Sequence, residues 1–148
     1  MAAHIEYVNE IDRPLAKVFH FFADEHVNNH PRWDPDMELE QLSDGPIGVG
    51  TVIKRRNSRY GTPVEGTMEI VEFDRDRTMG TVIHDGDMEI RARVLFEALA
   101  DDRTRMTTLI ELPAKDESMD QSFLLGKLER SAKIQRELME SEIPPGDG

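Results

Sequence analysis

The segment from residue 88 to 96 constrains the fold of this chain more than any other, because apolar and charged side chains alternate along it. The apolar positions on one side are Met88, Ile90, Ala92, Val94 and Phe96. Successive side chains of a β-strand point to opposite faces. The pattern therefore predicts a strand with one buried and one solvated face, which is typical of an antiparallel sheet covered on a single side.

The wider region from residue 37 to 112 has the same character. It shows no sustained helical period, and its short alternating runs are separated by turn-forming residues at hairpin-like intervals. These turn signals are Gly45-Pro46, Gly48, Gly50, Gly61-Thr62-Pro63, Asp74-Arg75-Asp76, Asp85-Gly86 and Asp101-Asp102. We predict six consecutive antiparallel strands here.

The N-terminal part adds one strand and two short helices. Residues 5–11 roughly alternate and predict a further strand, so the sheet has about seven strands. Asp12 is expected to cap a short helix that carries Pro14 near its first turn and reaches about Asp24. A second short helix should end before Pro31, and a loop carrying Trp33 should follow it.

A long helix is predicted at the C-terminal end. Pro113 ends the sheet, Ser118 can cap the helix, and about twenty residues in α-helix span roughly 30 Å. The expected apolar stripe is Met119, Phe123, Leu124, Leu128, Ala132, Gln135, Leu138 and Met139. We expect one α+β domain over residues 1–143, with a frayed tail at 144–148.

Charge and composition narrow the classes of partner. The formal net charge is −12, which repels nucleic-acid phosphates and anionic lipid heads alike. The chain has no cysteine, no secretory signal pattern and no apolar run long enough to span a bilayer. We therefore expect a cytoplasmic protein that does not bind nucleic acid or insert into membranes, as a monomer or a homodimer.

Four segments in the right order carry a resemblance to a known family. They are residues 13–19, beginning Arg13-Pro14-Leu15, residues 30–35, residues 45–51 and residues 71–77. Together these segments resemble the START-like superfamily (SRPBCC) of helix-grip proteins, especially the polyketide cyclase/dehydrase-like members, over nearly the whole chain. The resemblance implies a curved sheet wrapped around the C-terminal helix, with a cavity between them for lipids, aromatic polyketides or other apolar compounds.

The candidate ligand-binding residues follow from the inward faces of the predicted elements. They are Trp33, Met68, Ile90, Ala92, Val94, Phe96, Met106, Thr108, Ile110, Phe123, Leu124 and Leu128. From the pattern alone, a filled core and an open pocket are equally compatible, and the resemblance favours the pocket. For Trp33 the alternatives are roofing the pocket mouth and, as the preferred one, anchoring its loop onto the sheet edge.

A cyclase would need an acid or base on the cavity wall. The catalytic candidates are Arg55, Tyr7 and His84, and Tyr60 and Glu72 are further candidates. Arg55 lies two residues after Ile53, on the same face of the predicted strand, so it could point inward and orient a carbonyl or carboxylate. The preferred alternative for Arg55 is a bulge that turns it to solvent with its basic neighbours. His84 lies at a predicted hairpin, where histidine is an ordinary flanking residue.

Two histidines raise the question of a metal. His26 and His30 are four residues apart, which places both rings on one helical face. There is no glutamate in the HExxH position, and Pro31 suggests that the helix ends there. We therefore expect a solvated helix end, no metal site and no cofactor.

The leading hypothesis is a protein that binds a small, mainly hydrophobic molecule in an internal cavity. The alternative is an aromatic polyketide cyclase/dehydrase that uses a cavity acid–base residue, so the sequence leaves open whether the chain is an enzyme. A third possibility is an interaction module, which would present an exposed apolar patch outside the cavity mouth.

Overall fold

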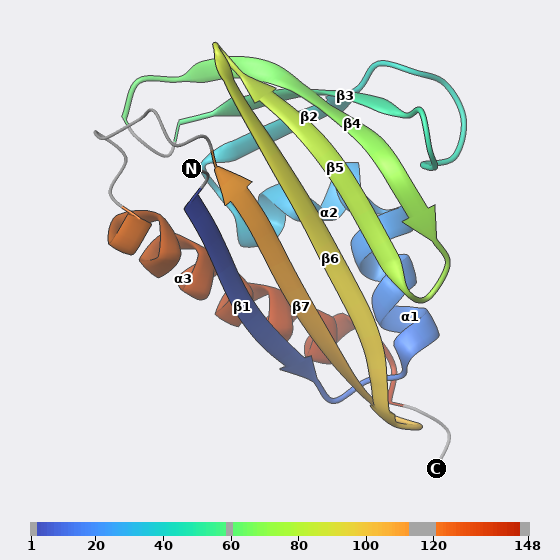
Figure 1. Cartoon of the computed structure of the whole chain (residues 1–148). Helices are drawn as coiled ribbons and strands as arrows, with labels where there is room; N and C mark the ends of the chain where they lie inside the picture. Colours follow the sequence, from blue (N-terminus) through green and yellow to red (C-terminus); the bar gives the residue numbers. More distant parts are fainter. Residues whose placement is uncertain (1–2, 59–60, 113–120, 146–148) are drawn as a thin grey trace.

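The computed structural model describes residues 3–58, 61–112 and 121–145. The strands are β1 (Ala3–Ile11), β2 (Met37–Gln41), β3 (Val52–Asn57), β4 (Val64–Asp74), β5 (Thr78–Asp85), β6 (Met88–Ala100) and β7 (Arg103–Leu112). The helices are α1 (Leu15–Phe19), the π-helical turn η1 (His20–Asp24), α2 (His26–Trp33) and α3 (Gln121–Glu142). Figure 1 shows a curved sheet with the helices on one side of it.

All seven strands form one antiparallel sheet in the order β1-β7-β6-β5-β4-β3-β2. Strands β2 to β7 are neighbours in the order in which they occur in the sequence. The last strand, β7, also pairs with the first strand, β1. The predicted alternation of β6 holds, because Ile90, Val94 and Phe96 are buried while Arg91 and Arg93 are exposed. The predicted helix-grip fold, with six consecutive strands, is confirmed.

The start of α1 differs from the prediction. The N-cap residue is Pro14, without a side-chain hydrogen bond, so the expected capping role of Asp12 is wrong. The backbone N–H of Asp12 instead donates to Glu140 Oε2 of α3 at 2.9 Å. Arg13 holds the same end of α3, because its Nε donates to the carbonyl of Ile143 at 2.7 Å. Residues 12 and 13 therefore tie the first strand to the end of the last helix.

Helix α2 contains Pro31 and ends at Trp33, so the prediction that it ends before Pro31 is wrong. A proline in this place removes one hydrogen bond, the one that its N–H would give to the carbonyl of Val27. Packing outweighs that loss. The Trp33 side chain is only 4% exposed, and its ring stacks on Phe22 at 5.7 Å between centroids.

Helix α3 runs along the sheet next to β1 (Figure 1). Its inner side is formed by Leu124, Leu128, Gln135 and Met139, which are all buried. Phe123 is 43% exposed, which corrects its expected place on the inner stripe. Consecutive residues of an α-helix are about 100° apart around the axis, so turning Leu124 inward turns Phe123 away. The predicted helix start, Ser118 and Met119, lies outside the described residues.

Candidate functional site

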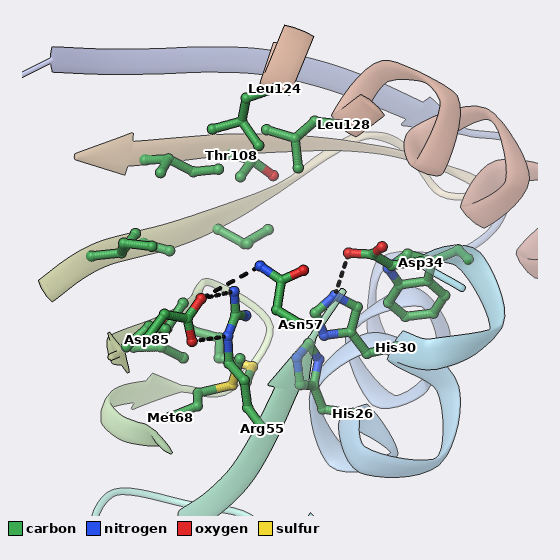
Figure 2. Close-up of a pocket in the computed structure, with 18 of the residues that line it drawn as sticks. His26, His30, Asp34, Arg55, Asn57, Met68, Asp85, Thr108, Leu124 and Leu128 are labelled. Atoms are coloured by element: carbon green, nitrogen blue, oxygen red, sulfur yellow. Dashed lines mark hydrogen bonds and ion pairs between the residues drawn. The ribbon is translucent and has the colours of Figure 1, made fainter. Parts of the chain in front are cut away.

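A cavity of about 130 Å³ lies between the inner face of the sheet and helices α2 and α3. Most of its wall is apolar, and one end is polar. Figure 2 shows Leu124 and Leu128 of α3 on one side, and the polar side chains of α2, β3 and β5 opposite them. The sheet and α3 therefore do not pack solid against each other.

Most of the sequence-predicted ligand-binding residues line this cavity. Those that do are Trp33, Met68, Ile90, Ala92, Val94, Thr108, Ile110, Leu124 and Leu128. Lining residues that sequence reasoning did not assign include Phe22, Asp34, Asn57, Thr81, Ile83, Asp85 and Gln135. Thr81 and Ile83 obey the alternation of β5, which could have identified them, whereas Phe22 lies in η1 and Asp85 was interpreted as a turn residue.

Three predicted lining residues lie elsewhere. Phe96 packs edge-on against Phe19 at 5.0 Å and Phe22 at 5.6 Å, and Met106 sits opposite Phe96 in the register of β7. Both are buried under α1 and η1, in a closed part of the core and outside the cavity wall. Phe123 faces outward, as described above. The prediction placed the whole inner face of β6 and β7 in the pocket, but the N-terminal helices fill one end of it.

The polar end is built around Arg55. Its Nε donates to Asp85 Oδ1 at 2.8 Å and its Nη2 to Asp85 Oδ2 at 2.9 Å, while Asn57 Nδ2 lies 3.5 Å from the same carboxylate (Figure 2). The side chains of Arg55 and Asp85 are 5% and 2% exposed. Strand β3 pairs regularly with both neighbours, so the bulge that would have turned Arg55 to solvent is absent. A buried bidentate pair of this kind fixes the guanidinium in one orientation.

Gly66 of β4 lies between these two residues. In the register, Arg55 is opposite Gly66, and Gly66 is opposite Asp85. A Cβ at Gly66 would overlap the backbone carbonyl oxygen of His84. The missing side chain lets β4 and β5 approach closely and leaves the inner face open, so that Arg55 reaches Asp85 across the intervening strand.

His26 and His30 extend the polar end, so the expectation of a solvated helix end is wrong. Burial, with smaller contributions from His30 and Arg55, lowers the pKa of His26 from 6.5 to about 3. His26 Nδ1 lies 3.0 Å from the carbonyl of Phe22, which can only accept, so this nitrogen carries the proton. His26 is thus neutral near pH 7, with Nε2 as a hydrogen-bond acceptor.

His30 pairs with the carboxylate of Asp34. The distance from His30 Nε2 to Asp34 Oδ2 is 3.5 Å, and both side chains are largely buried (Figure 2). Among the described residues, no three His, Asp or Glu side chains are grouped so that they could hold a metal ion.

The catalytic candidates are divided between the cavity and the outer surface. Tyr7 and Arg55 line the cavity. His84 is exposed and lies 3.2 Å from Glu89 on the outer face of the sheet, so it does not contribute to the cavity. Its neighbours Ile83 and Asp85 point inward instead, because side chains alternate along β5. Glu72 is also on the outer face, paired with Arg93 at 2.9 Å, and Tyr60 lies outside the described residues.

Solved structures of other proteins share this fold. A START superfamily protein from Mycobacterium smegmatis has a TM-score of 0.77 at 14% identity, over 93% of this chain and 97% of that one. The Zhui aromatase/cyclase from a Streptomyces species has a TM-score of 0.71 at 16% identity, over 96% and 93%. Norcoclaurine synthase from Thalictrum flavum, in complex with dopamine and hydroxybenzaldehyde, has a TM-score of 0.73 at 16% identity, over 97% and 90%. At such identities the likeness is one of fold.

No curated protein matches the sequence. Among the described residues, no helix combines the length and the apolar character needed to cross a bilayer. The family model described as polyketide cyclase / dehydrase and lipid transport matches residues 2–133, which is most of the chain. With the sheet, the long C-terminal helix and the cavity between them, this match identifies the chain as a member of the polyketide cyclase / dehydrase and lipid transport family.

Proposed function

We propose that this protein binds a small, mainly hydrophobic molecule in the cavity between its sheet and α3. The observation that carries the proposal is an internal space of about 130 Å³ with a largely apolar wall and a few converging polar groups. Ligand sites in proteins have this composition, with apolar walls for affinity and a small number of polar groups for orientation. The description of the family, which includes lipid transport, supports the same class of function.

Trp33 provides a direct test. It is the only tryptophan of the chain and it lines the cavity. A panel of single-ring aromatics and short acyl compounds is added to the full chain, and the indole N–H signal of Trp33 is followed by NMR. We expect saturable shifts of this signal with at least one class of compound.

A cavity-filling variant shows whether binding occurs in the cavity. Ala92→Leu on β6 adds volume inside the wall, whereas Ala98→Leu on the same strand adds it at an exposed position. We expect Ala92→Leu to weaken binding by at least about tenfold and Ala98→Leu to leave it unchanged. If no compound shifts the Trp33 signal, or if Ala92→Leu binds like the wild type, the proposal is wrong.

A second candidate function is an aromatic cyclase or dehydrase. It is favoured by one observation, namely that Arg55 and Tyr7 both contribute polar groups to the cavity wall. A guanidinium could polarise a substrate carbonyl while the phenol exchanges a proton. Turnover of a linear poly-β-ketone should then fall in Arg55→Gln and Tyr7→Phe and stay unchanged in His84→Gln, whose side chain is outside. Equal turnover in all three variants would exclude this function.

A further inference from the structure

The hydrogen-bond donors of Arg55 at the polar end of the cavity bear on which ligands can bind there. Asp85 takes two of the five N–H groups of the Arg55 guanidinium, and Arg55 Nη1 makes no hydrogen bond to any described residue. The Arg55 side chain is nevertheless only 5% exposed to solvent. Because Arg55 lines the cavity, its remaining donors can be satisfied there by an acceptor on a bound molecule or by water.

The charge of Arg55 is already compensated. Among the described residues that line the cavity, Asp85 balances Arg55, and Asp34 adds a second carboxylate beside His30. His26 contributes no positive charge near neutral pH, because burial keeps it neutral. The wall therefore has no excess positive charge whether or not His30 carries a proton. A carboxylate ligand would bring an uncompensated negative charge into a buried site, which is costly.

The size of the cavity sets a second limit. An apolar protein cavity of about 150 Å³ holds one benzene molecule. The cavity here measures about 130 Å³, so it accommodates a molecule of about one ring.

On this basis we propose that the ligand is a neutral, single-ring-sized molecule whose carbonyl-type oxygen accepts hydrogen bonds from Arg55, and that Asp85 excludes carboxylates. This inference rests on the proposed function and narrows its ligand class. Arg55 supplies the donors, while Asp85 orients the guanidinium and neutralises it. An unpaired arginine at the same place would instead select an anion.

Three single-ring probes test the proposal at pH 7 on the full chain, and two of them, acetophenone and benzoate, have nearly the same shape. Acetophenone is neutral and carries a carbonyl, benzoate carries a carboxylate, and toluene carries no acceptor. Dissociation constants are measured from the NMR titration of the Trp33 indole N–H. We expect acetophenone to bind at least about tenfold more tightly than benzoate, and measurably more tightly than toluene.

Variants then assign the selectivity to individual residues. Asp85→Asn should raise the affinity for benzoate relative to that for acetophenone by about tenfold or more. Asp87→Asn in the exposed turn should leave this ratio of affinities unchanged. Arg55→Gln should remove the advantage of acetophenone over toluene. Arg56→Gln, the exposed neighbour on β3, should keep it.

The outcomes separate this inference from the proposed function. If benzoate or toluene binds to the wild type as tightly as acetophenone does, the inference is wrong. The proposed function, binding of a mainly hydrophobic molecule, is not contradicted by that result. If none of the three probes binds but other compounds of the wider panel do, the inference is also wrong and the proposed function stands. If nothing in the panel binds, both are wrong. The wild-type ranking decides the question even if Asp85→Asn fails to fold.

Discussion

Arg55 and Asp85 form a bidentate ion pair across a strand to which neither belongs. Arg55 is on β3 and Asp85 on β5, and their atoms meet at 2.8 and 2.9 Å over Gly66 of β4. The pair is buried at the polar end of a cavity whose wall is mostly apolar. Because the two side chains come from non-adjacent strands, their contact holds β3, β4 and β5 in one register.

Breaking this pair should destabilise the protein strongly. Asp85→Ala leaves the guanidinium of Arg55 buried and unpaired, and we expect the free energy of unfolding to fall by about 3–5 kcal/mol. The double variant Arg55→Met/Asp85→Ala removes both charges and should recover much of that loss. Urea denaturation measures both values.

An exposed pair on the same sheet serves as the control. Arg93 and Glu72 are also joined by two hydrogen bonds, but on the solvent-facing side. Glu72→Ala should cost less than about 1 kcal/mol. Equal losses for Glu72→Ala and Asp85→Ala would contradict a special role for burial.

Two glycines should respond to alanine in opposite directions. Gly66→Ala places a Cβ against the backbone of His84, which cannot move as a flexible side chain does, so we expect a loss of about 2 kcal/mol or more. Gly126 lies inside α3, and a Cβ there meets nothing within 4 Å. Gly126→Ala should raise the free energy of unfolding by about 0.5–1 kcal/mol. Thermal unfolding of both variants decides the sign of each effect.

His26 should make stability depend on pH. Its pKa is lowered from 6.5 to about 3 in the folded state, first of all by burial, so between these values the unfolded chain binds more protons. Its contribution is fully present above about pH 6.5 and is lost as the pH falls toward 3, by up to about 1.4 kcal/mol per pH unit. Urea midpoints at pH 7, 6 and 5 follow this loss.

Carboxylates also titrate in acid, so the contribution of His26 is isolated by comparing variants. His26→Gln should reduce the slope of stability between pH 7 and 5, whereas His84→Gln on the exposed face should leave it as in wild type. Parallel pH profiles for wild type and His26→Gln would show that His26 is not held neutral by burial.

The two faces of α3 can be distinguished at adjacent positions. Leu124 is 3% exposed and lines the cavity, so Leu124→Ala should cost about 2–5 kcal/mol. Phe123 is exposed, with Lys127 Nζ 5.4 Å from its ring centroid. Phe123→Ala should change the stability by less than about 1 kcal/mol. A larger loss at position 123 than at 124 would mean that the helix is rotated about its axis.

Local patterns determined much of this protein. The alternation in residues 88–96 and the turn residues between strands predicted the sheet, because strand geometry gives each position a fixed face. The inward positions of Ala92 and Thr108 followed from the same argument. Helical periodicity placed Leu124 and Leu128 correctly on the inner side of α3 but misplaced Phe123. Proline was less decisive, since α2 continues through Pro31 where the stacking of Trp33 on Phe22 compensates for one missing hydrogen bond.

The tertiary structure alone decided the polar end of the cavity. Asp85 could not be distinguished from an ordinary turn residue, because its partner Arg55 lies two strands away and the contact depends on the pairing register and on Gly66. The neutral state of His26 likewise depends on burial by groups distant in the sequence. The sequence determines which face each side chain takes within its own element. Which side chains then meet in the interior, and in which charge state, is decided only when distant elements pack together and exclude water.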